Sequence, residues 1–454
     1  MRKYFGTDGI RDIANINLTP EFAFRVAKAG ATVLAKTMGH TPVILIGKDT
    51  RISGNMLECA MIAGFLSVGA NVKSLGVTPT PVVSYLTVKE KADAAVVISA
   101  SHNSYEYNGI KFFSNKGMKL SDEIEEEIEA LLEDEETLRS LNVGYDKIGQ
   151  LTLAYELNNE YEEYILDILK DILALNKNDF KVLIDTANGA TYKMAENLFK
   201  KLNIKFDIIN NKPNGININE KCGSTHLEML KECVVKNKYD LGIAYDGDGD
   251  RMLAVDETGR IIDGDALLAI ISQYLKEKNE LESDTLVATV MSNIGLHEFV
   301  SNNNIKFEQT KVGDRYVLER MLEGNYVLGG EQSGHIILRK YNNTGDGILT
   351  SLFLIKILLE KSWKPSKIWE VFQQYPQILI NARVDNEKKK DYNSNKIICD
   401  AIEEINKLLE NKGRVLVRAS GTEPLVRVMI EGKDINFITE KAKSLANLIE
   451  DVLK

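Results

Sequence analysis

Six short apolar runs, each followed directly by a small polar loop, restrict the fold of this chain more than any other feature. The runs lie at 43–46, 94–98, 182–184, 241–245, 286–290 and 326–328. Short, continuously apolar runs are typical of strands that are buried on both faces of a parallel or mixed sheet. Helix-like stretches separate the runs, which fall into three successive pairs. The pattern therefore predicts an α/β protein built from three related units.

Apolar periodicity and length predict six helices in this part of the chain. Their expected ranges are 19–37, 121–141, 153–175, 227–237, 265–280 and 345–361. After about residue 366 the pattern changes. Strand-like runs at 378–384, 414–418 and 425–431 are flanked there by helix-like stretches at 388–410 and 435–453. We therefore expect a smaller α+β unit at the C-terminal end. The expected domains are 1–150, 151–251, 252–365 and 366–454.

Charge and cysteine content exclude several classes of protein. The chain has 454 residues with 66 Asp and Glu against 56 Lys and Arg. This acidic balance argues against a general nucleic-acid binder but allows an anionic small substrate, which needs only a few local cations. The four cysteines form no C-x-x-C pair, and we expect reduced thiols. No signal-like segment or membrane-length apolar run is present, so we expect a cytoplasmic protein without a membrane partner.

Three aspartates at alternate positions form the sharpest chemical signal. They lie in the motif Asp-Gly-Asp-Gly-Asp-Arg at 246–251. Its glycines allow the backbone to curl, so that Asp246, Asp248 and Asp250 can converge on one hard cation. A calcium loop of the EF-hand type is excluded, because the sixth position of that loop requires glycine and is Arg251 here. Few oxygen ligands beside an arginine favour Mg²⁺ that shares its coordination shell with a phosphate.

A serine loop with the sequence Ser-Ala-Ser-His-Asn-Ser follows the second apolar run at 99–104. Ser101 is a candidate nucleophile, and His102 and Lys111 are candidate proton carriers or partners of phosphate charge. A Ser–His hydrolase is the competing enzyme class. However, adjacent side chains of an extended segment point apart, and the chain contains no Gly-x-Ser-x-Gly elbow. Alone, the loop is equally compatible with an ordinary capped turn.

Two further polar loops have compositions suited to a sugar phosphate. One loop offers two cations, two hydroxyls and a glycine that exposes backbone N–H groups, at Arg418, Ser420, Gly421, Thr422 and Arg427. These groups form a candidate phosphate clamp, with a plain polar hairpin as the alternative. The other loop, Gly-Glu-Gln-Ser-Gly-His at 330–335, offers groups that can bind sugar hydroxyls. P-loop and dinucleotide fingerprints are absent, which disfavours a nucleotide-driven kinase or dehydrogenase.

Together the four loops resemble those of the α-D-phosphohexomutase superfamily. In chain order they read SASHN, DGDGDR, GEQSGH and RASGTEPLVR, and the similarity runs from KYFGTDGIR at 3–11 to Val428. Finer features resemble the phosphoglucosamine mutase branch, namely NGININ at 214–219, CGSTH at 222–226, VGDRYV at 312–317 and TGDG at 344–347. One departure is Ser104, because the serine loop of the family usually continues with proline.

The resemblance implies a fold and a reaction. The fold would have three mixed-sheet α/β domains and a smaller C-terminal α+β domain around a central cleft. The enzyme would be an isomerase that interconverts glucosamine 6-phosphate and glucosamine 1-phosphate, a step toward UDP-N-acetylglucosamine and peptidoglycan. Ser101 would pass its phosphoryl group to the sugar and give glucosamine 1,6-bisphosphate. This intermediate would turn over and return its other phosphate to Ser101.

The resemblance also implies a role for each candidate residue. One Mg²⁺ per chain would be held by the phosphate on Ser101 and by Asp246, Asp248 and Asp250. The cations near the transferred charge would be Arg11, Lys111 and Arg251. Either His102 or Lys111 would carry the proton. The ligands of the non-reacting phosphate would be Arg418, Ser420, Gly421, Thr422 and Arg427. Glu331 and Ser333 would bind the sugar hydroxyls in either orientation.

Several alternatives remain open at this point. A phosphomannomutase or phosphoglucomutase of the same superfamily would differ only in its preferred sugar. A non-enzymatic sugar-phosphate sensor and a phosphatase are alternatives from other classes. The sequence leaves the oligomeric state open, with a homodimer among the options.

Overall fold

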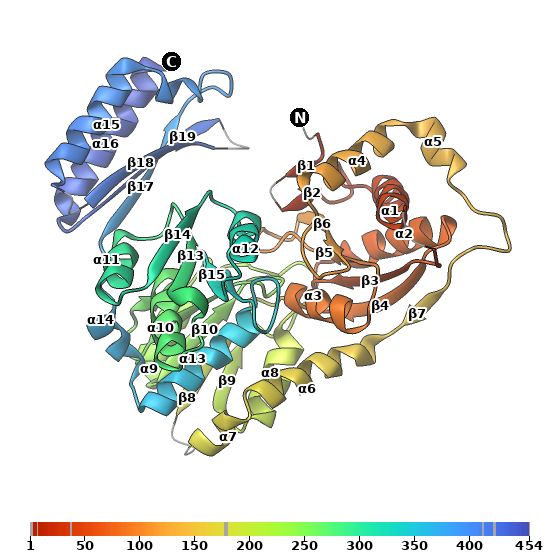
Figure 1. The fold of residues 1–454 in the computed structure, drawn as a ribbon, viewed down its shortest axis with the longest axis horizontal. Helices are drawn as coiled ribbons and strands as arrows, with labels where there is room; N and C mark the ends of the chain where they lie inside the picture. Colours follow the sequence, from red (N-terminus) through yellow and green to blue (C-terminus); the bar gives the residue numbers. More distant parts are fainter. Residues whose placement is uncertain are drawn as a thin grey trace. The chain divides into compact units, whose positions relative to one another are not determined.

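Three mixed β-sheets and one antiparallel sheet organise the chain (Figure 1). The computed structural model describes residues 3–6, 8–36, 39–176, 180–410, 413–420 and 424–453. Within these ranges no helix combines the length and apolarity that a membrane span requires. The residues group into two compact units, 1–291 with 306–368, and 292–305 with 369–454. Gly421 and Thr422, two predicted phosphate ligands, lie outside the described residues.

The first sheet has seven strands in the order β1-β2-β6-β5-β3-β4-β7. The strands are β1 (Phe5–Gly6), β2 (Gly9–Ile13), β3 (Val43–Lys48), β4 (Asn71–Val77), β5 (Ala94–Ile98), β6 (Tyr107–Ser114) and β7 (Leu151–Leu153). The associated helices are α1 (Pro20–Ala35), α2 (Gly54–Ser67), α3 (Thr80–Lys89), α4 (Asp122–Glu133) and α5 (Glu135–Ser140). Every residue of β5 is buried, as its continuously apolar sequence requires.

The second sheet has five strands in the order β12-β11-β10-β8-β9. The strands are β8 (Lys181–Asp185), β9 (Lys205–Ile209), β10 (Leu241–Tyr245), β11 (Met252–Asp256) and β12 (Ile261–Ile262). The helices of this segment are η1 (Tyr155–Leu157), α6 (Asn158–Ile168), α7 (Asp171–Leu175), α8 (Tyr192–Lys201) and α9 (Glu228–Asn237). The sheet is mixed, because β10 is parallel to β8 but antiparallel to β11.

The third sheet has four strands in the order β14-β13-β15-β16. The strands are β13 (Thr285–Thr289), β14 (Lys306–Thr310), β15 (Leu328–Gly330) and β16 (Ile336–Leu338). The helices are α10 (Gly264–Glu277), η2 (Glu282–Asp284), α12 (Asp314–Glu323), α13 (Gly347–Lys361) and η3 (Pro365–Lys367). The N-terminus of α13 is capped by Asp346, whose side chain accepts a hydrogen bond from the Leu349 N–H.

The second unit contains an antiparallel sheet in the order β17-β19-β18. Its strands are β17 (Gln377–Arg383), β18 (Gly413–Ala419) and β19 (Leu425–Gly432). Its helical segments are α11 (Ile294–Asn302), α14 (Ile368–Val371), η4 (Asp391–Asn393), α15 (Lys396–Leu408) and α16 (Ile435–Val452). Apolar side chains of β19, α15 and α16 form one buried core with β17. With this sheet the expected fold class, three mixed-sheet units and a smaller C-terminal unit, is confirmed.

The expected pairing of the six apolar runs is also found. The first two runs form β3 and β5, the next two form β8 and β10, and the last two lead into β13 and β15. In each case the two strands are adjacent and parallel. Because the carboxyl ends of parallel strands meet at one edge of a sheet, each pair brings two of the predicted polar loops together.

Three expected helices differ from the observed ones because of local capping. The stretch 121–141 is two helices, since the Asp134 side chain accepts a hydrogen bond from the Thr137 N–H and begins α5. The stretch 153–175 divides into η1, α6 and α7, with a break at Leu169. The stretch 388–410 becomes helical only at Lys396, because the Asn395 side chain caps the N-terminus of α15.

Candidate active site

Ser101 lies in the loop that follows β5 and is almost completely buried. Its hydroxyl donates a hydrogen bond of 2.6 Å to Asp246 Oδ2, so the serine and metal loops meet. Its backbone is left-handed, with φ of 50°. This conformation brings Ser101 Oγ to 3.4 Å from His102 Nδ1. The expectation that these two side chains point apart was wrong, because it assumed an extended backbone.

The three predicted metal ligands form a compact buried cluster. One carboxylate oxygen from each of Asp246, Asp248 and Asp250 lies within 4.8 Å of the others. Gly249 has a φ of 73°, which provides the curl expected of the loop. Among the described residues, Asp248 Oδ1 and Asp250 Oδ1 are buried without a hydrogen-bond partner. Two buried oxygens that accept no hydrogen bond fit the coordination of a hard cation.

The electrostatics of the cluster also fit a bound cation. Burial raises the pKa of Asp246 well above its usual value, and the carboxylates of Asp250 and Asp248 add to the rise. Burial acts in the same direction on Asp248, but Lys111 outweighs it and lowers the pKa of that carboxyl. Lys111 therefore compensates one carboxylate, whereas the repulsion that Asp246 experiences would be relieved by a metal ion.

Lys111 on β6 is the central cation of the site. Its Nζ lies 2.8 Å from Asp248 Oδ2 and 3.0 Å from Asp8 Oδ2. Burial opposes its charge, but Asp248 and Asp8 raise its pKa above the ordinary value. Lys111 is therefore protonated at neutral pH. Arg11 on β2 forms an ion pair with the same Asp8, and Arg251 Nε lies 3.8 Å from Asp250 Oδ1.

His102 has the opposite protonation state. Burial, together with the nearby positive charges of Arg251 and Arg11, lowers the pKa of its imidazole to about 4. The ring is therefore neutral at physiological pH and can accept a proton. The two candidate proton carriers therefore differ in charge state, because neutral His102 can accept a proton whereas protonated Lys111 can donate one.

The loop after β15 approaches the same cluster. Glu331 Oε1 accepts a hydrogen bond of 3.2 Å from the Gly313 N–H. Burial raises the pKa of Glu331, and nearby Asp314 adds to the effect. His335 Nε2 lies 3.3 Å from Asp314 Oδ2 and 3.9 Å from Asp250 Oδ2. Ser333 is exposed. The loop therefore provides a buried carboxyl at Glu331 and an exposed hydroxyl at Ser333.

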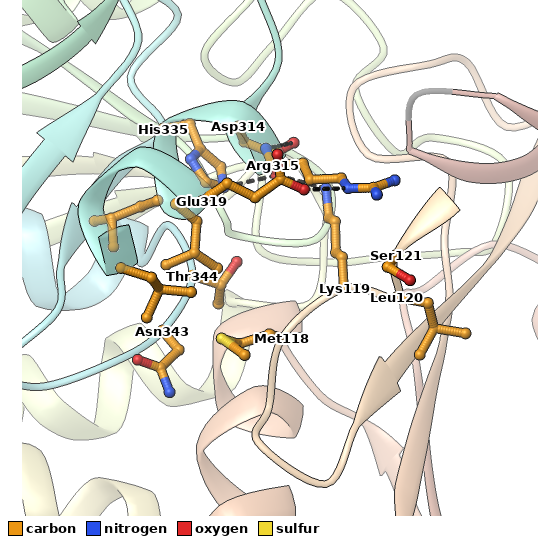
Figure 2. Close-up of a pocket in the computed structure, with 13 residues that line it drawn as sticks. Met118, Lys119, Leu120, Ser121, Asp314, Arg315, Glu319, His335, Asn343 and Thr344 are labelled. Carbon is orange, nitrogen blue, oxygen red and sulfur yellow. Dashed lines mark hydrogen bonds and ion pairs between the residues drawn. The ribbon is translucent and has the colours of Figure 1, made fainter. Parts of the chain in front are cut away.

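A cavity of about 190 Å³ lies beside this loop. Figure 2 shows Lys119, Asp314 and His335 at its wall. Asp314 forms an ion pair with Lys119, and its Oδ2 lies 3.3 Å from His335 Nε2. Lys119 also pairs with Asp8, which links the cavity wall to the Lys111 cluster.

In the second unit, the predicted phosphate clamp has its two arginines directly opposite each other. Arg418 on β18 and Arg427 on β19 are cross-strand partners. The Ser420 N–H donates a hydrogen bond of 2.9 Å to the Leu425 carbonyl, which closes the end of the hairpin. The hairpin therefore places two arginines at directly opposite positions, where both guanidinium groups could contact one phosphate.

Family models match nearly the whole chain. They are described as phosphoglucomutase/phosphomannomutase alpha/beta/alpha domain I at residues 2–139, domain II at 159–259, domain III at 263–375, and the C-terminal domain at 379–448. The boundaries between the models fall close to those between the four sheets, although β7, β12 and the first two residues of β17 lie outside any match.

Relatives with about 50% sequence identity indicate the branch of this family to which the chain belongs. A protein of Acetivibrio thermocellus named phosphoglucosamine mutase is 49% identical over 453 residues and covers 100% of both chains. Proteins of the same name from Caldicellulosiruptor bescii and Clostridioides difficile are 51% and 50% identical, again over 100% of both chains. This chain belongs to the phosphoglucosamine mutase family. The chain is therefore an isomerase, as expected from the resemblance of its four loops.

Solved structures share the fold of this phosphoglucosamine mutase family member at lower identity. A phosphoglucomutase/phosphomannomutase family protein from Burkholderia thailandensis gives a TM-score of 0.80 at 22% identity and covers 98% of both chains. The N-acetylphosphoglucosamine mutase of Aspergillus fumigatus, solved with GlcNAc-6P and magnesium, gives a TM-score of 0.72 at 18% identity. It matches 100% of this chain and 96% of its own.

Several residues that shape the site of this phosphoglucosamine mutase family member were missed from the sequence. Thr80, at the N-terminus of α3, donates from its backbone to the Asp248 carbonyl at 2.9 Å and from its hydroxyl to Asp248 Oδ2 at 2.7 Å. Asp8 and Lys119 extend the ion-pair cluster around Lys111. Only Asp8 had a signal, because it lies in the KYFGTDGIR segment that carried part of the resemblance.

Proposed function

We propose that this chain interconverts glucosamine 6-phosphate and glucosamine 1-phosphate through a phosphorylated Ser101. The observation that carries the proposal is the hydrogen bond of 2.6 Å between the buried Ser101 hydroxyl and Asp246 in the acidic cluster. A hydroxyl at this position is poised to carry a phosphoryl group beside a divalent cation. The name and full-length identity of the phosphoglucosamine mutase relatives support the choice of sugar.

Residues of the site can account for each bond and proton in the proposed phosphoryl transfer. The bond from phosphorus to Ser101 Oγ breaks and a bond from phosphorus to a sugar oxygen forms. The sugar hydroxyl proton goes to neutral His102, which returns it to Ser101 Oγ. Protonated Lys111 and Arg11 neutralise part of the phosphoryl charge, and transfer in the reverse sense returns the other phosphate of glucosamine 1,6-bisphosphate to Ser101.

We propose one Mg²⁺ per chain at Asp246, Asp248 and Asp250, with the oxygen of Ser101 or its phosphate as a further ligand. When bound, the ion supplies positive charge to the phosphoryl oxygens. The two buried carboxylate oxygens that accept no hydrogen bond support this assignment. The magnesium in the structure of the Aspergillus fumigatus relative supports the identity of the metal.

Substrate binding is assigned to three groups of residues. Arg251 is proposed to bind phosphate near the metal loop, and Glu331 and Ser333 to bind the sugar hydroxyls. The proposed ligands of the non-reacting phosphate are Arg418, Ser420, Gly421, Thr422 and Arg427. The cross-strand pairing of the two arginines supports this clamp, since two opposite guanidinium groups can bind one phosphate together.

The remaining expectations also belong to this proposal. We propose the domains 1–150, 151–251, 252–365 and 366–454, each with one of the four polar loops. The strands β11 and β12, which follow residue 251, belong to the second sheet. We also propose a cytoplasmic role upstream of UDP-N-acetylglucosamine, with a small sugar phosphate as the partner and no nucleic acid or membrane. A homodimer is compatible with this role.

Turnover of three sugar phosphates tests the proposed function. Glucosamine, glucose and mannose 1-phosphates are assayed with one preparation of phosphorylated enzyme, and intact mass with peptide mapping locates the phosphate. We expect catalytic efficiency to be highest with glucosamine, because a charge-assisted bond from its amine is stronger than a neutral bond from a hydroxyl. The preference should be moderate, since the sugar binds in two orientations and no one side chain contacts the amine in both.

The Ser101→Ala variant is the control for this assay, and it should show no phosphate and no turnover. An efficiency ratio of glucosamine to glucose at or below unity would assign the chain to the phosphoglucomutase or phosphomannomutase branch. Free phosphate as the main product would indicate a phosphatase. Absence of any phosphate exchange would indicate a sugar-phosphate sensor.

A further inference from the structure

Two buried side chains, Arg51 and Asn219, hold the backbone of the serine loop. The Arg51 guanidinium donates to the carbonyl oxygens of Ser101 at 2.9 Å and Asn103 at 2.8 Å. The Asn219 amide donates to the same two oxygens, at 2.8 Å and 2.9 Å. Arg51 also donates to the carbonyl of Ser104. Both carbonyls beside the reacting hydroxyl therefore accept hydrogen bonds from two side chains at once.

The Arg51 guanidinium is in turn held by an ion pair with Asp49. Its Nε donates to Asp49 Oδ2 at 2.9 Å, and both side chains are 0% exposed. Asp49 Oδ2 also accepts a hydrogen bond of 2.6 Å from the Ser99 hydroxyl, whose oxygen accepts from the Ser101 N–H at 2.9 Å. The Asp49–Arg51 pair therefore holds the N–H side of Ser101 through Ser99 and the carbonyl side directly.

Asn219 connects the serine loop to the segment that carries the metal loop. It belongs to the stretch after β9, and its backbone N–H donates to the Ala187 carbonyl at 2.9 Å. Its amide nitrogen lies so close to Gly247 that a Cβ atom at Gly247 would be 2.9 Å from it. Asn219 therefore touches both loops whose side chains meet at Ser101 and Asp246.

The serine loop needs such support because Ser101 has a left-handed backbone. A non-glycine residue with φ of 50° is strained, and it keeps this conformation only where its surroundings determine it. We propose that Arg51 and Asn219 are positioning residues that hold the Ser101 hydroxyl on the carboxylate cluster. The proposal rests on the proposed function, in which this oxygen carries the phosphoryl group. Neither side chain needs to contact the sugar for this role.

The test compares three variants with two matched controls in the full-length enzyme. Asn219→Gly removes the amide and suits the backbone, because Asn219 has φ of 58°. Asn219→Asp keeps the shape but turns an oxygen toward the two carbonyls. Arg51→Lys keeps the charge beside Asp49 but loses the guanidinium fork. The controls are Asn203→Gly, at φ of 52° in the turn between α8 and β9, and Arg339→Lys, which donates to the Tyr326 carbonyl.

We expect all three variants to lower kcat by roughly tenfold to a hundredfold, since a misplacement of about 1 Å can cost that much in rate. The KM for glucosamine phosphate should change by less than about twofold, because substrate contacts are unchanged. Amide hydrogen exchange of the peptide at 99–108 should accelerate in the variants alone. Both controls should match the parent enzyme in all three measurements.

Normal kcat in Asn219→Gly and Asn219→Asp would overturn the proposal, and so would a rise in KM without a fall in kcat. If Arg51→Lys does not fold, the two Asn219 variants decide. A parent enzyme without turnover and without phosphate on Ser101 would instead refute the proposed function. In that case, unchanged exchange at 99–108 in both Asn219 variants would overturn the positioning role, and faster exchange would support it.

Discussion

At the scale of single residues, Asp248 belongs both to the three-carboxylate cluster and to the ion pairs around Lys111. One of its oxygens accepts from Lys111 and Thr80, while the other is buried without a hydrogen-bond partner among the described residues. Lys111 and Thr80 thus fix the carboxylate in place and leave one oxygen for the cation. Loss of charge at this position removes a metal ligand and also leaves the buried ammonium of Lys111 poorly compensated.

We therefore expect Asp248→Asn to lower kcat by roughly 10²–10³-fold, comparable with the loss of one strong electrostatic contact in a transition state. Excess chelator should abolish activity of the parent enzyme, and added Mg²⁺ should restore it. The assay is mutase turnover across a Mg²⁺ titration. Asp207→Asn, which alters an ion pair with Lys181 elsewhere in the second sheet, is the control. Full activity of the parent enzyme in chelator would contradict the metal assignment.

The sequence could predict those residues whose role is indicated by a short contiguous motif. Three aspartates spaced by glycines identify a metal loop without any knowledge of the fold, and the structure brings their oxygens together. Arg51, Thr80 and Asn219 were not predicted. Each acts on a loop that lies 50 to 168 positions away in the chain, so only tertiary packing reveals these contacts, although Asn219 lies in the NGININ segment that carried part of the resemblance.

At the scale of elements, the loop after β8 and the loop after β10 touch through glycines. A Cβ atom at Gly189 would lie 2.8 Å from Gly247 Cα, and closer still to the Gly247 carbonyl oxygen. Backbone packed this tightly cannot accept a methyl group without displacement of the metal loop. The closeness follows from the parallel pairing of β8 with β10, which places both loops at one edge of the sheet.

Gly189→Ala should therefore displace the three aspartates without altering any of them. Overpacking of this kind costs about 1–3 kcal/mol, and 1.4 kcal/mol in metal binding corresponds to a tenfold change in affinity. We expect the Mg²⁺ concentration for half-maximal activity to rise about tenfold. Gly39→Ala is the matched control, because a Cβ there meets nothing within 4 Å. Equal Mg²⁺ dependence in the two variants would argue against this coupling.

The positions of helices and strands were predicted well where apolar runs were continuous, and poorly where capping residues determine the ends of helices. β5 and β10 are buried along their whole length, so their sequences are continuously apolar and identified them as strands. By contrast, Asp134 ends one helix and begins the next inside a stretch whose apolar periodicity continues. A short side chain that competes for backbone N–H groups leaves only a weak signal in such a pattern.

At the scale of the whole molecule, the proposed phosphate clamp belongs to a unit of its own with a separate hydrophobic core. We expect Arg418→Ala and Arg427→Ala each to raise the KM for sugar phosphate by at least about tenfold, because a charge-assisted contact contributes about 1.5–3 kcal/mol. The value of kcat should fall less. Initial-rate kinetics measure both constants, and Arg383→Ala on β17 of the same sheet is the control. Unchanged KM in both variants would place the phosphate elsewhere.

The second unit is not a continuous segment of chain, and this matters for recombination between relatives. Helix α11 belongs to it although the strands on either side of α11 belong to the first unit. The fully buried Glu431 accepts from the Ile294 N–H at 3.1 Å, and the Asn293 amide donates to the Tyr375 carbonyl at 3.0 Å. A gene cut near codon 366 would separate these partners. A chimera that takes residues 369–454 from a relative would therefore fold well only if its 292–305 segment fits the new antiparallel sheet. For the same reason, we expect substitutions in these two segments to have accumulated together during evolution.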